Sequence, residues 1–183
     1  MATEQQLDHV VQSSETIVQT MRDDGTFPNN EQLPLVLYRG AIRVAEDDPA
    51  ATIEQVFAAN GWGNSWRNGI FPYHHYHSTA HEVLGVARGT AQVQLGGDSN
   101  GATFELQAGD VLILPAGVAH KNLGSSADFQ VIGAYPAGQR WDMNYGKPGE
   151  RPQADQQIAQ VPRPETDPVY GKDGPLAEQW QLQ

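Results

Sequence analysis

The stretch GDVLILPAGVAH, residues 109–120, contains the clearest strand–turn–strand pattern in the chain. A turn at Gly109 leads into the apolar run VLIL, which Pro115 ends because proline has no backbone N–H to give to a neighbouring strand. Gly117 then permits a second tight turn, and His120 begins a strand that returns along the first. This stretch therefore predicts antiparallel β-structure.

Similar short runs of strand-forming residues lie on both sides of this unit, separated by glycines and other turn residues. We expect strands near residues 70–77, 82–88, 90–95, 103–107, 110–114, 118–123 and 129–135. The connection GGDSNG at 96–101 consists of residues that tolerate the backbone conformations of a hairpin loop. So many short strands joined by turns indicate an all-β sandwich or barrel with antiparallel sheets.

Two helices are predicted before this β-rich region. Apolar residues recur at helical spacing after Thr3, and Gln6 completes a capping-box pattern, so we expect a first helix that ends near Gly25. Its apolar residues are Leu7, Val10, Val11, Ile17, Val18 and Met21. The second helix is expected from Asp48 as N-cap to a stop at Asn60 and Gly61, with Pro49 at its first position. Between the two helices, LPLVLYRGAI at 33–42 predicts a short strand.

The region after Pro136 is polar and rich in proline, with one short helix expected near residues 151–160. It has two interpretations, a disordered tail or an ordered extension packed on the β-domain. We favour the second because the region carries too many apolar side chains for a free tail. They are Trp141, Ile158, Val161, Val169, Tyr170, Leu176 and Trp180. We therefore expect one structural domain with three parts: an N-terminal extension over 1–65, a barrel core over 66–136 and a C-terminal extension over 137–183.

Charge and composition exclude several classes of function. The 183 residues carry a net charge of −11 with scattered basic residues, which disfavours nucleic acid and anionic membranes as partners. The chain has no cysteine, so disulfides, thiolate metal sites and cysteine nucleophiles are excluded. We find no signal peptide and no long apolar run, and we expect a cytoplasmic protein.

The segment HHYHSTAHE, residues 74–82, holds four of the six histidines of the chain. Side chains two apart on a strand share a face, so His75 and His77 can point into the barrel together. Glu82 begins the next strand, and His120 begins a strand of the unit described above. Three neutral imidazoles and one carboxylate suit one divalent transition metal per chain: iron, manganese, nickel, cobalt or zinc.

The same histidines also have a simpler interpretation as a surface patch, because an HxH pattern alone occurs by chance. His74 and Tyr76 are expected on the opposite face of the strand, and His81 in a turn, either exposed or as a support of the metal ligands. Tyr73 shares the inward face with His75 and His77, and Asn122 shares the face of His120, so both are candidate pocket residues or supports of the metal ligands.

The spacing of these residues resembles the two sequence motifs of the cupin superfamily. The first motif is matched by Gly69, His75, His77, Glu82 and Gly89, and the second by Gly109, Pro115, Gly117 and His120. One departure is that the asparagine usual at position 124 is replaced by Gly124, with Asn122 nearby. The match covers about residues 66–135, and HSTAHEVLGVARG, LPAGVAHKNLG and DPVYGKDGPL also resemble the YjlB-like branch.

The resemblance implies a single antiparallel jelly-roll barrel of six to eight strands, with His75, His77, Glu82 and His120 as metal ligands and commonly a homodimer. A second subunit, or the N-terminal segment, is also expected to cover the apolar outer face formed by Val83, Gly85 and Ala87. We expect a metal-dependent enzyme acting on a small molecule, of dioxygenase or isomerase/lyase type. The alternative is a non-catalytic cupin that binds or stores a small ligand in a metal-dependent way. A transcription regulator would need a helix-turn-helix unit that neither predicted helix forms.

Overall fold

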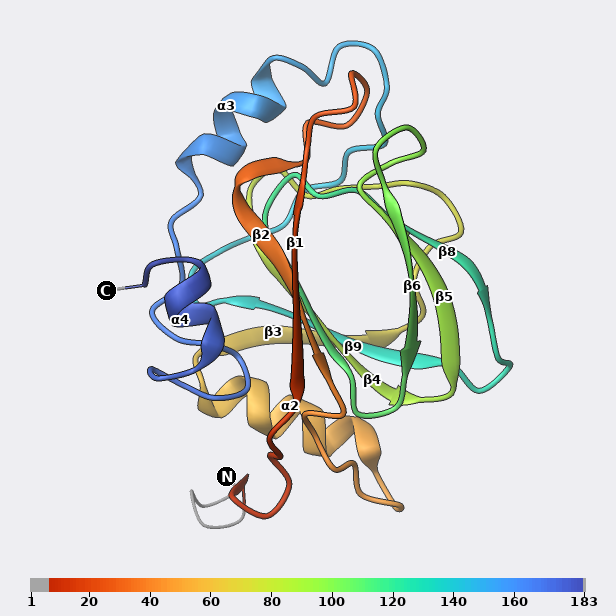
Figure 1. Cartoon of the computed structure of the whole chain (residues 1–183), viewed down its shortest axis with the longest axis vertical. Helices are drawn as coiled ribbons and strands as arrows, with labels where there is room; N and C mark the ends of the chain where they lie inside the picture. Colours follow the sequence, from red (N-terminus) through yellow and green to blue (C-terminus); the bar gives the residue numbers. More distant parts are fainter. Residues whose placement is uncertain (1–6, 183) are drawn as a thin grey trace.

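The computed structural model describes residues 7–182 and shows two antiparallel β-sheets facing each other, with three helices outside them (Figure 1). Within these residues, the larger sheet has six strands in the order β1-β2-β7-β4-β9-β3, and the smaller has three in the order β6-β5-β8. The strands are β1 Glu15–Met21, β2 Asn30–Arg39, β3 Trp62–Asn68, β4 Glu82–Arg88, β5 Thr90–Leu95, β6 Ala102–Gln107, β7 Val111–Leu114, β8 His120–Ser125 and β9 Gln130–Pro136. The helices are α2 Pro49–Ala59, α3 Gln153–Gln160 and α4 Pro175–Gln179.

The all-β prediction is confirmed, and the two sheets form a jelly-roll-like sandwich rather than a closed barrel. The central strands β4, β7 and β9 of the large sheet are buried on both faces, which explains the unbroken apolar run of β7. In β4, Leu84 and Val86 pack in the core between the sheets, while Val83 and Ala87 pack in a second core on the other face. Because side chains alternate along a strand, Glu82 shares the inner face with Leu84.

Helix α2 covers the outer apolar face of β4. This helix belongs to the N-terminal extension, so that extension covers the face, and no second subunit is needed there. Ile53 and Phe57 of this helix pack so close to β4 that a Cβ at Gly85 would lie 2.6 Å and 2.9 Å from their side chains. The helix begins as predicted, because the Asp48 side chain accepts a hydrogen bond of 3.0 Å from the N–H of Ala51. The prediction of this second helix is confirmed.

The prediction of the first helix is wrong over residues 15–21, which form strand β1, whereas Leu7 is helical and residues 8–10 form a turn. Thr3 and Gln6, the proposed capping residues, lie outside the described residues. Strand β1 pairs with β2 in antiparallel register, with Ile17 opposite Leu37. Thr16, Ile17 and Val18 are β-branched and favour a strand, and their apolar spacing fits either structure. Pairing with β2, which the local pattern does not contain, decides between the two.

The strand predicted near 70–77 is also wrong. Apart from isolated bridges at His75 and Tyr76, residues 69–81 are irregular, and Pro72 interrupts any longer pairing. The other strands predicted after residue 80 are confirmed to within two residues. Strand β3 was missed because its sequence WGNSWRN is mostly polar, which an edge strand tolerates, and the short α4 was missed as well.

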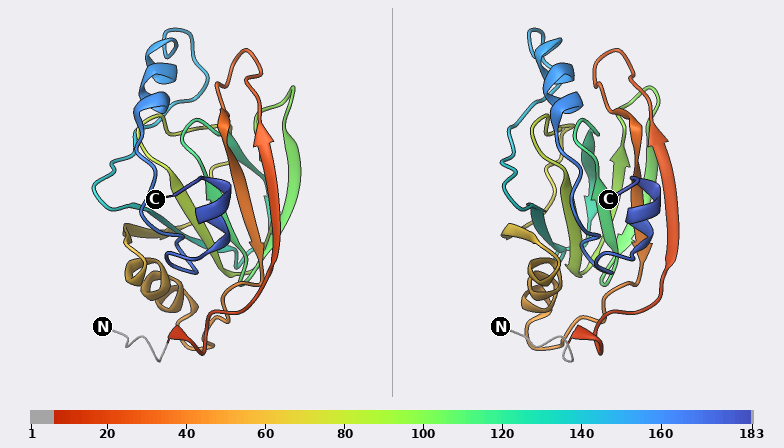
Figure 2. Two further views of the ribbon diagram at one scale, coloured as in Figure 1. Left: turned by 60° about the vertical axis from the view of Figure 1, so that its left-hand side comes forward. Right: turned by 90° about the vertical axis from the view of Figure 1, so that its left-hand side faces the viewer.

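The C-terminal extension runs back along the sandwich and places α3 and α4 on its outside (Figure 2). Ala154, Val169, Leu176 and Trp180 are buried there. The indole N–H of Trp180 donates a 2.8 Å hydrogen bond to the carbonyl of Pro34 in β2. Within residues 7–182, the helices are all too short or too polar to cross a membrane.

Candidate metal centre

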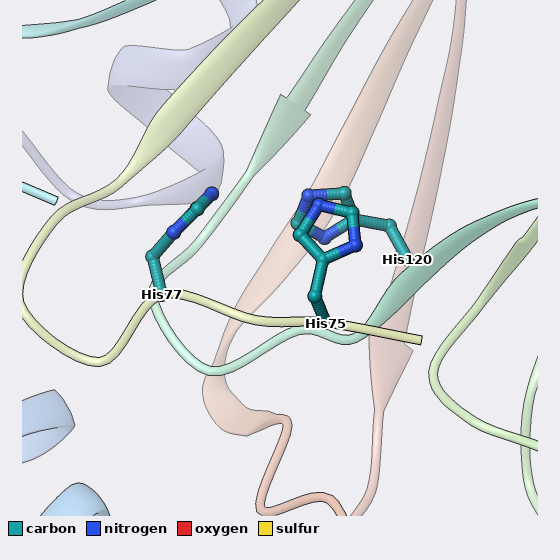
Figure 3. A group of neighbouring side chains, drawn as sticks. All are labelled: His75, His77 and His120. Atoms are coloured by element: carbon teal, nitrogen blue, oxygen red, sulfur yellow. The ribbon is translucent and has the colours of Figure 1, made fainter. Parts of the chain in front are cut away.

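His75 and His120 lie side by side although forty-five positions separate them in the sequence. Their backbones form a two-way bridge, in which the N–H of His75 donates to the carbonyl of His120 at 3.2 Å and the reverse bond is 3.0 Å. The ring centroids are 4.0 Å apart. His77 follows on the same segment, and the three rings converge (Figure 3). Local extended backbone at the bridge is enough to keep His75 and His77 on one side, although no long strand forms.

Each of the three buried histidines turns one ring nitrogen towards a backbone carbonyl. The Nδ1 atoms lie 3.1 Å, 2.5 Å and 3.0 Å from the carbonyl oxygens of Tyr73, Asp142 and Val118, respectively. A carbonyl oxygen only accepts, so each Nδ1 carries the hydrogen and each neutral ring keeps a lone pair on Nε2. One nitrogen from each ring lies within 4.8 Å of the others. Three buried imidazoles held in this way can bind a metal ion.

Glu82 lies beside two of these histidines, and one of its oxygens has no hydrogen-bond partner. Oε2 of this buried carboxylate lies 3.2 Å from Nε2 of His77 and 3.3 Å from Nε2 of His120. Lone pairs facing each other at such distances repel unless a proton or a cation lies between them. The other oxygen, Oε1, accepts a 3.1 Å hydrogen bond from the hydroxyl of Tyr135. The donor set therefore fits a divalent transition metal.

The electrostatics favour an ionised Glu82 beside a neutral His75. Burial lowers the pKa of His75 to about 3, and the neighbouring His120 acts in the same direction. Burial alone would raise the pKa of Glu82, but His77 and His120 outweigh it and hold this pKa well below its usual range. For His77 burial acts to lower the pKa, and the negative charge of Glu82 raises it above its ordinary value. The site thus offers one negative charge and at least one neutral imidazole near pH 7.

The cluster opens into a cavity of about 220 Å³ between the sheets. Apart from the four residues above, most of its lining is apolar or aromatic. The lining residues are Trp66, Arg67, Asn68, Gly69, Ile70, Phe71, Leu84, Tyr135, Trp141 and Met143. Phe71 packs edge-on against His75 and Trp141 against His77, with ring centroids 5.2 Å and 5.8 Å apart. Two aromatic rings therefore flank the histidine cluster.

The structure places the remaining histidines away from this cavity. His74 faces the other side of its segment, with Nε2 2.9 Å from Asp98. The expectation that His81 is exposed is wrong, because this residue is only 1% exposed. Its Nδ1 accepts a 2.9 Å hydrogen bond from the N–H of Ala116, and its ring packs on Trp180. The turn that contains His81 is buried because Trp180 of the C-terminal extension packs on it.

Neither Tyr73 nor Asn122 lines the cavity. Tyr73 stacks on Phe71 near the surface and contributes its backbone carbonyl to His75. The side chain of Asn122 bonds instead to its own loop, accepting from the N–H of Gly124 and donating to Ser125. Trp66 does line the cavity.

Sequence reasoning missed two residues that support the cluster, Tyr135 and Asp142. Tyr135 shares the inner face of β9 with Val131 and Gly133, so strand alternation was an available signal. The Tyr135 hydroxyl accepts a 2.7 Å hydrogen bond from the indole N–H of Trp66. The Trp66 ring can lie this close to β9 because Gly133 has no Cβ. No sequence pattern pointed to Asp142. Its backbone carbonyl reaches His77 from the C-terminal extension through tertiary packing alone.

Comparison with known proteins identifies the family of this chain. Residues 67–129 match the family model described as a cupin domain. The chain belongs to the cupin superfamily, as its two motifs suggested. It is 47% identical over 158 residues to the uncharacterized protein YjlB of Bacillus subtilis (strain 168). The aligned residues cover 86% of this chain and 92% of that protein.

Solved structures with a similar fold are much more distant. Acireductone dioxygenase from Bacillus anthracis, with a cadmium ion in its active centre, is 16% identical, with a TM-score of 0.40 over 79% of this chain and 91% of that one. Procruciferin, an 11S globulin from Brassica napus, is 16% identical with a TM-score of 0.37 over 73% of this chain. A mutant of oxalate decarboxylase OxdC from Bacillus subtilis is 18% identical, with a TM-score of 0.36 over 65% of this chain. This chain spans 27% of the globulin and 29% of the decarboxylase.

Proposed function

We propose that this protein is a metal-dependent enzyme that acts on a small molecule, with one divalent transition metal held by His75, His77, Glu82 and His120. The observation that carries the proposal is the unpartnered Oε2 of Glu82, buried and facing the Nε2 atoms of His77 and His120. A buried carboxylate oxygen in this position costs free energy unless a cation satisfies it. The adjoining cavity gives a small molecule access to the same point.

A metal bound there would act as a Lewis acid, or bind oxygen, in the dioxygenase and isomerase or lyase reactions considered for this class of site. The contribution of the protein is to hold the ligands and exclude water. Backbone carbonyls orient the three imidazoles, and Tyr135 holds Oε1 of Glu82 so that Oε2 remains free. The largely apolar lining keeps bulk water from the reacting groups.

The alternative is a cupin that binds or stores a small ligand without converting it. The same cavity and ligand set serve either role, so the distinction requires a measurement of turnover. Oxygen uptake by the iron-loaded protein, with catechols, thiols and keto acids as candidate substrates, tests the dioxygenase version. Full metal occupancy with neither turnover of any such compound nor isomerisation of a carbonyl compound would favour the binding module.

The homodimer and the cytoplasmic location stay predictions. The apolar face of β4 that suggested a partner is covered by α2 of the same chain, which removes that support for a dimer. Sedimentation of the purified protein measures its oligomeric state.

Metal analysis of the purified protein tests the proposed site. We expect about one transition metal ion per chain, and a loss of most of it in His75→Ala and His120→Ala, because each substitution removes one neutral nitrogen ligand. His9→Ala is the matched control, since His9 is exposed and distant from the cluster. Parent-like metal content in both cluster variants would show that the site is elsewhere.

A further inference from the structure

The aromatic rings and the scarcity of free positive charge around the cavity restrict what can bind there. Phe71 and Trp141 both line the cavity and are also 45% and 46% exposed, so they stand at its mouth. Each packs against a different histidine of the cluster, Phe71 against His75 and Trp141 against His77. Two partly exposed rings therefore lie between solvent and different histidines of the cluster.

Behind this mouth the lining continues with flat or apolar side chains. The ring of Tyr135 lies nearly parallel to that of Trp141, at an interplanar angle of 24°. Trp66 lies across Gly133, where a Cβ would come within 2.2 Å of the indole. Aromatic side chains favour flat ligands, because stacked and edge-on ring contacts add to the burial of apolar area.

The charges of the lining disfavour a dianionic ligand. Arg67 is the single Lys or Arg side chain among the lining residues, and its guanidinium already binds Glu54 at 2.7 Å and 3.0 Å and Asp48 at 3.3 Å. A divalent metal with three neutral imidazoles and the Glu82 carboxylate carries one net positive charge. A dianion would leave one buried negative charge without a cation, whereas a neutral molecule or a monoanion would not.

From these observations, and resting on the proposed metal site, we infer that the ligand is a small flat molecule with an aromatic or apolar body. It reaches the metal through one polar end, as a neutral species or a monoanion, and Phe71 and Trp141 select it at the mouth. Small dicarboxylates such as oxalate are excluded as preferred ligands. The class of ligand is thus set by the rings that line the cavity and by the net charge of the metal with its ligands.

Binding of two probes to the anaerobic, metal-containing protein tests this inference, by calorimetry or by quenching of tryptophan fluorescence. We expect 4-methylcatechol to bind more tightly than oxalate. We expect Trp141→Ala and Phe71→Leu each to weaken the binding of 4-methylcatechol about tenfold, which corresponds to about 1.4 kcal/mol, and to leave oxalate binding unchanged. Both side chains are nearly half exposed, so the variants should fold, and metal content and circular dichroism check this.

Tyr145→Ala is the matched control, because Tyr145 is an exposed aromatic residue that does not line this cavity. It should bind both probes as the parent does. Oxalate binding as tight as that of 4-methylcatechol, or an equal effect of Trp141→Ala on both probes, would overturn the inference while leaving the metal site intact. A parent protein that holds no metal would instead overturn the proposed function, and this inference with it.

Discussion

At the scale of single residues, the contact between Tyr135 and Glu82 decides how the carboxylate is presented. The hydroxyl of Tyr135 accepts from the indole of Trp66, so its own hydrogen is directed to Oε1 of Glu82. One carboxylate oxygen is thereby occupied, and the other faces the histidines. Tyr135 would be a positioning residue for the proposed metal, because it acts through Glu82.

We expect Tyr135→Phe to lower the affinity for the metal by about 10- to 100-fold, the usual effect of losing a hydrogen bond to a metal ligand. Competition with a chelator of known affinity measures this change. Tyr76→Phe is the control, since the Tyr76 hydroxyl donates to Glu150 and lies on the side away from the cavity. Equal metal affinity in Tyr135→Phe and the parent would show that the hydrogen bond does not position Glu82.

At the scale of elements, strand β4 separates two cores and carries one site residue. Its inner face has Glu82 and Leu84, and its outer face supports α2 at the closest approach of helix to sheet, Gly85. Any side chain at position 85 would push the helix away from the strand. The packing of α2 and the placement of Glu82 therefore depend on the same seven-residue element.

We expect Gly85→Ala to reduce the free energy of unfolding by about 1–3 kcal/mol, the usual cost of overpacking a filled core. Denaturant unfolding followed by circular dichroism measures the change. Gly124→Ala is the control, because a Cβ at Gly124 in β8 meets no atom within 4 Å. This control should leave stability unchanged or slightly higher. A parent-like Gly85→Ala would mean that α2 can shift at no cost.

At the scale of the whole molecule, the C-terminal extension is held to β2 by a buried polar contact. The hydroxyl of Tyr38 donates to the carboxylate of Asp167 and accepts a 3.0 Å hydrogen bond from the N–H of Leu176. The other oxygen of Asp167 accepts from the N–H groups of Val169 and Tyr170. Burial, followed by the charge of Asp167, raises the pKa of Tyr38 above its ordinary value near 10.

This raised pKa predicts a loss of stability in alkali. Tyr38 stays protonated in the folded protein, whereas in the unfolded chain it ionises near pH 10, so its contribution is present below pH 10 and is lost as the pH rises. We expect the free energy of unfolding to fall above pH 10, by up to about 1.4 kcal/mol per pH unit from this residue. Urea unfolding at a series of pH values measures the slope.

In Tyr38→Phe the alkaline slope should be shallower, although Tyr76, Tyr135 and Tyr170 also have raised pKa values and keep part of it. At pH 8 this variant should be about 1–3 kcal/mol less stable, because Asp167 and the N–H of Leu176 lose a buried partner. Tyr145→Phe, at an exposed residue, should behave as the parent. An unchanged slope in Tyr38→Phe would contradict the assignment to this contact.

Local periodicity was sufficient to predict most of the β-domain. Strand alternation put Leu84 and Glu82 on one face of β4, and the capping residue Asp48 marked the start of α2. Local periodicity did not predict the strand at residues 15–21, where the same apolar spacing fits a helix and a strand. It also did not predict the edge strand β3, whose residues are mostly polar. In both places the partner strand supplies the missing information.

The sequence by itself predicted most of the antiparallel β-structure, because turns and two-residue alternation act over a few residues, and its motif spacing picked out His75, His77, Glu82 and His120. The bridge that joins His75 to His120 across forty-five positions is a tertiary contact. The tertiary structure alone decided what surrounds them. Asp142 holds His77 from 65 positions away, Trp141 forms part of the cavity mouth, and Trp180 buries His81. These contacts depend on where the C-terminal extension packs, which is set by the shape of the finished sandwich and by no local pattern.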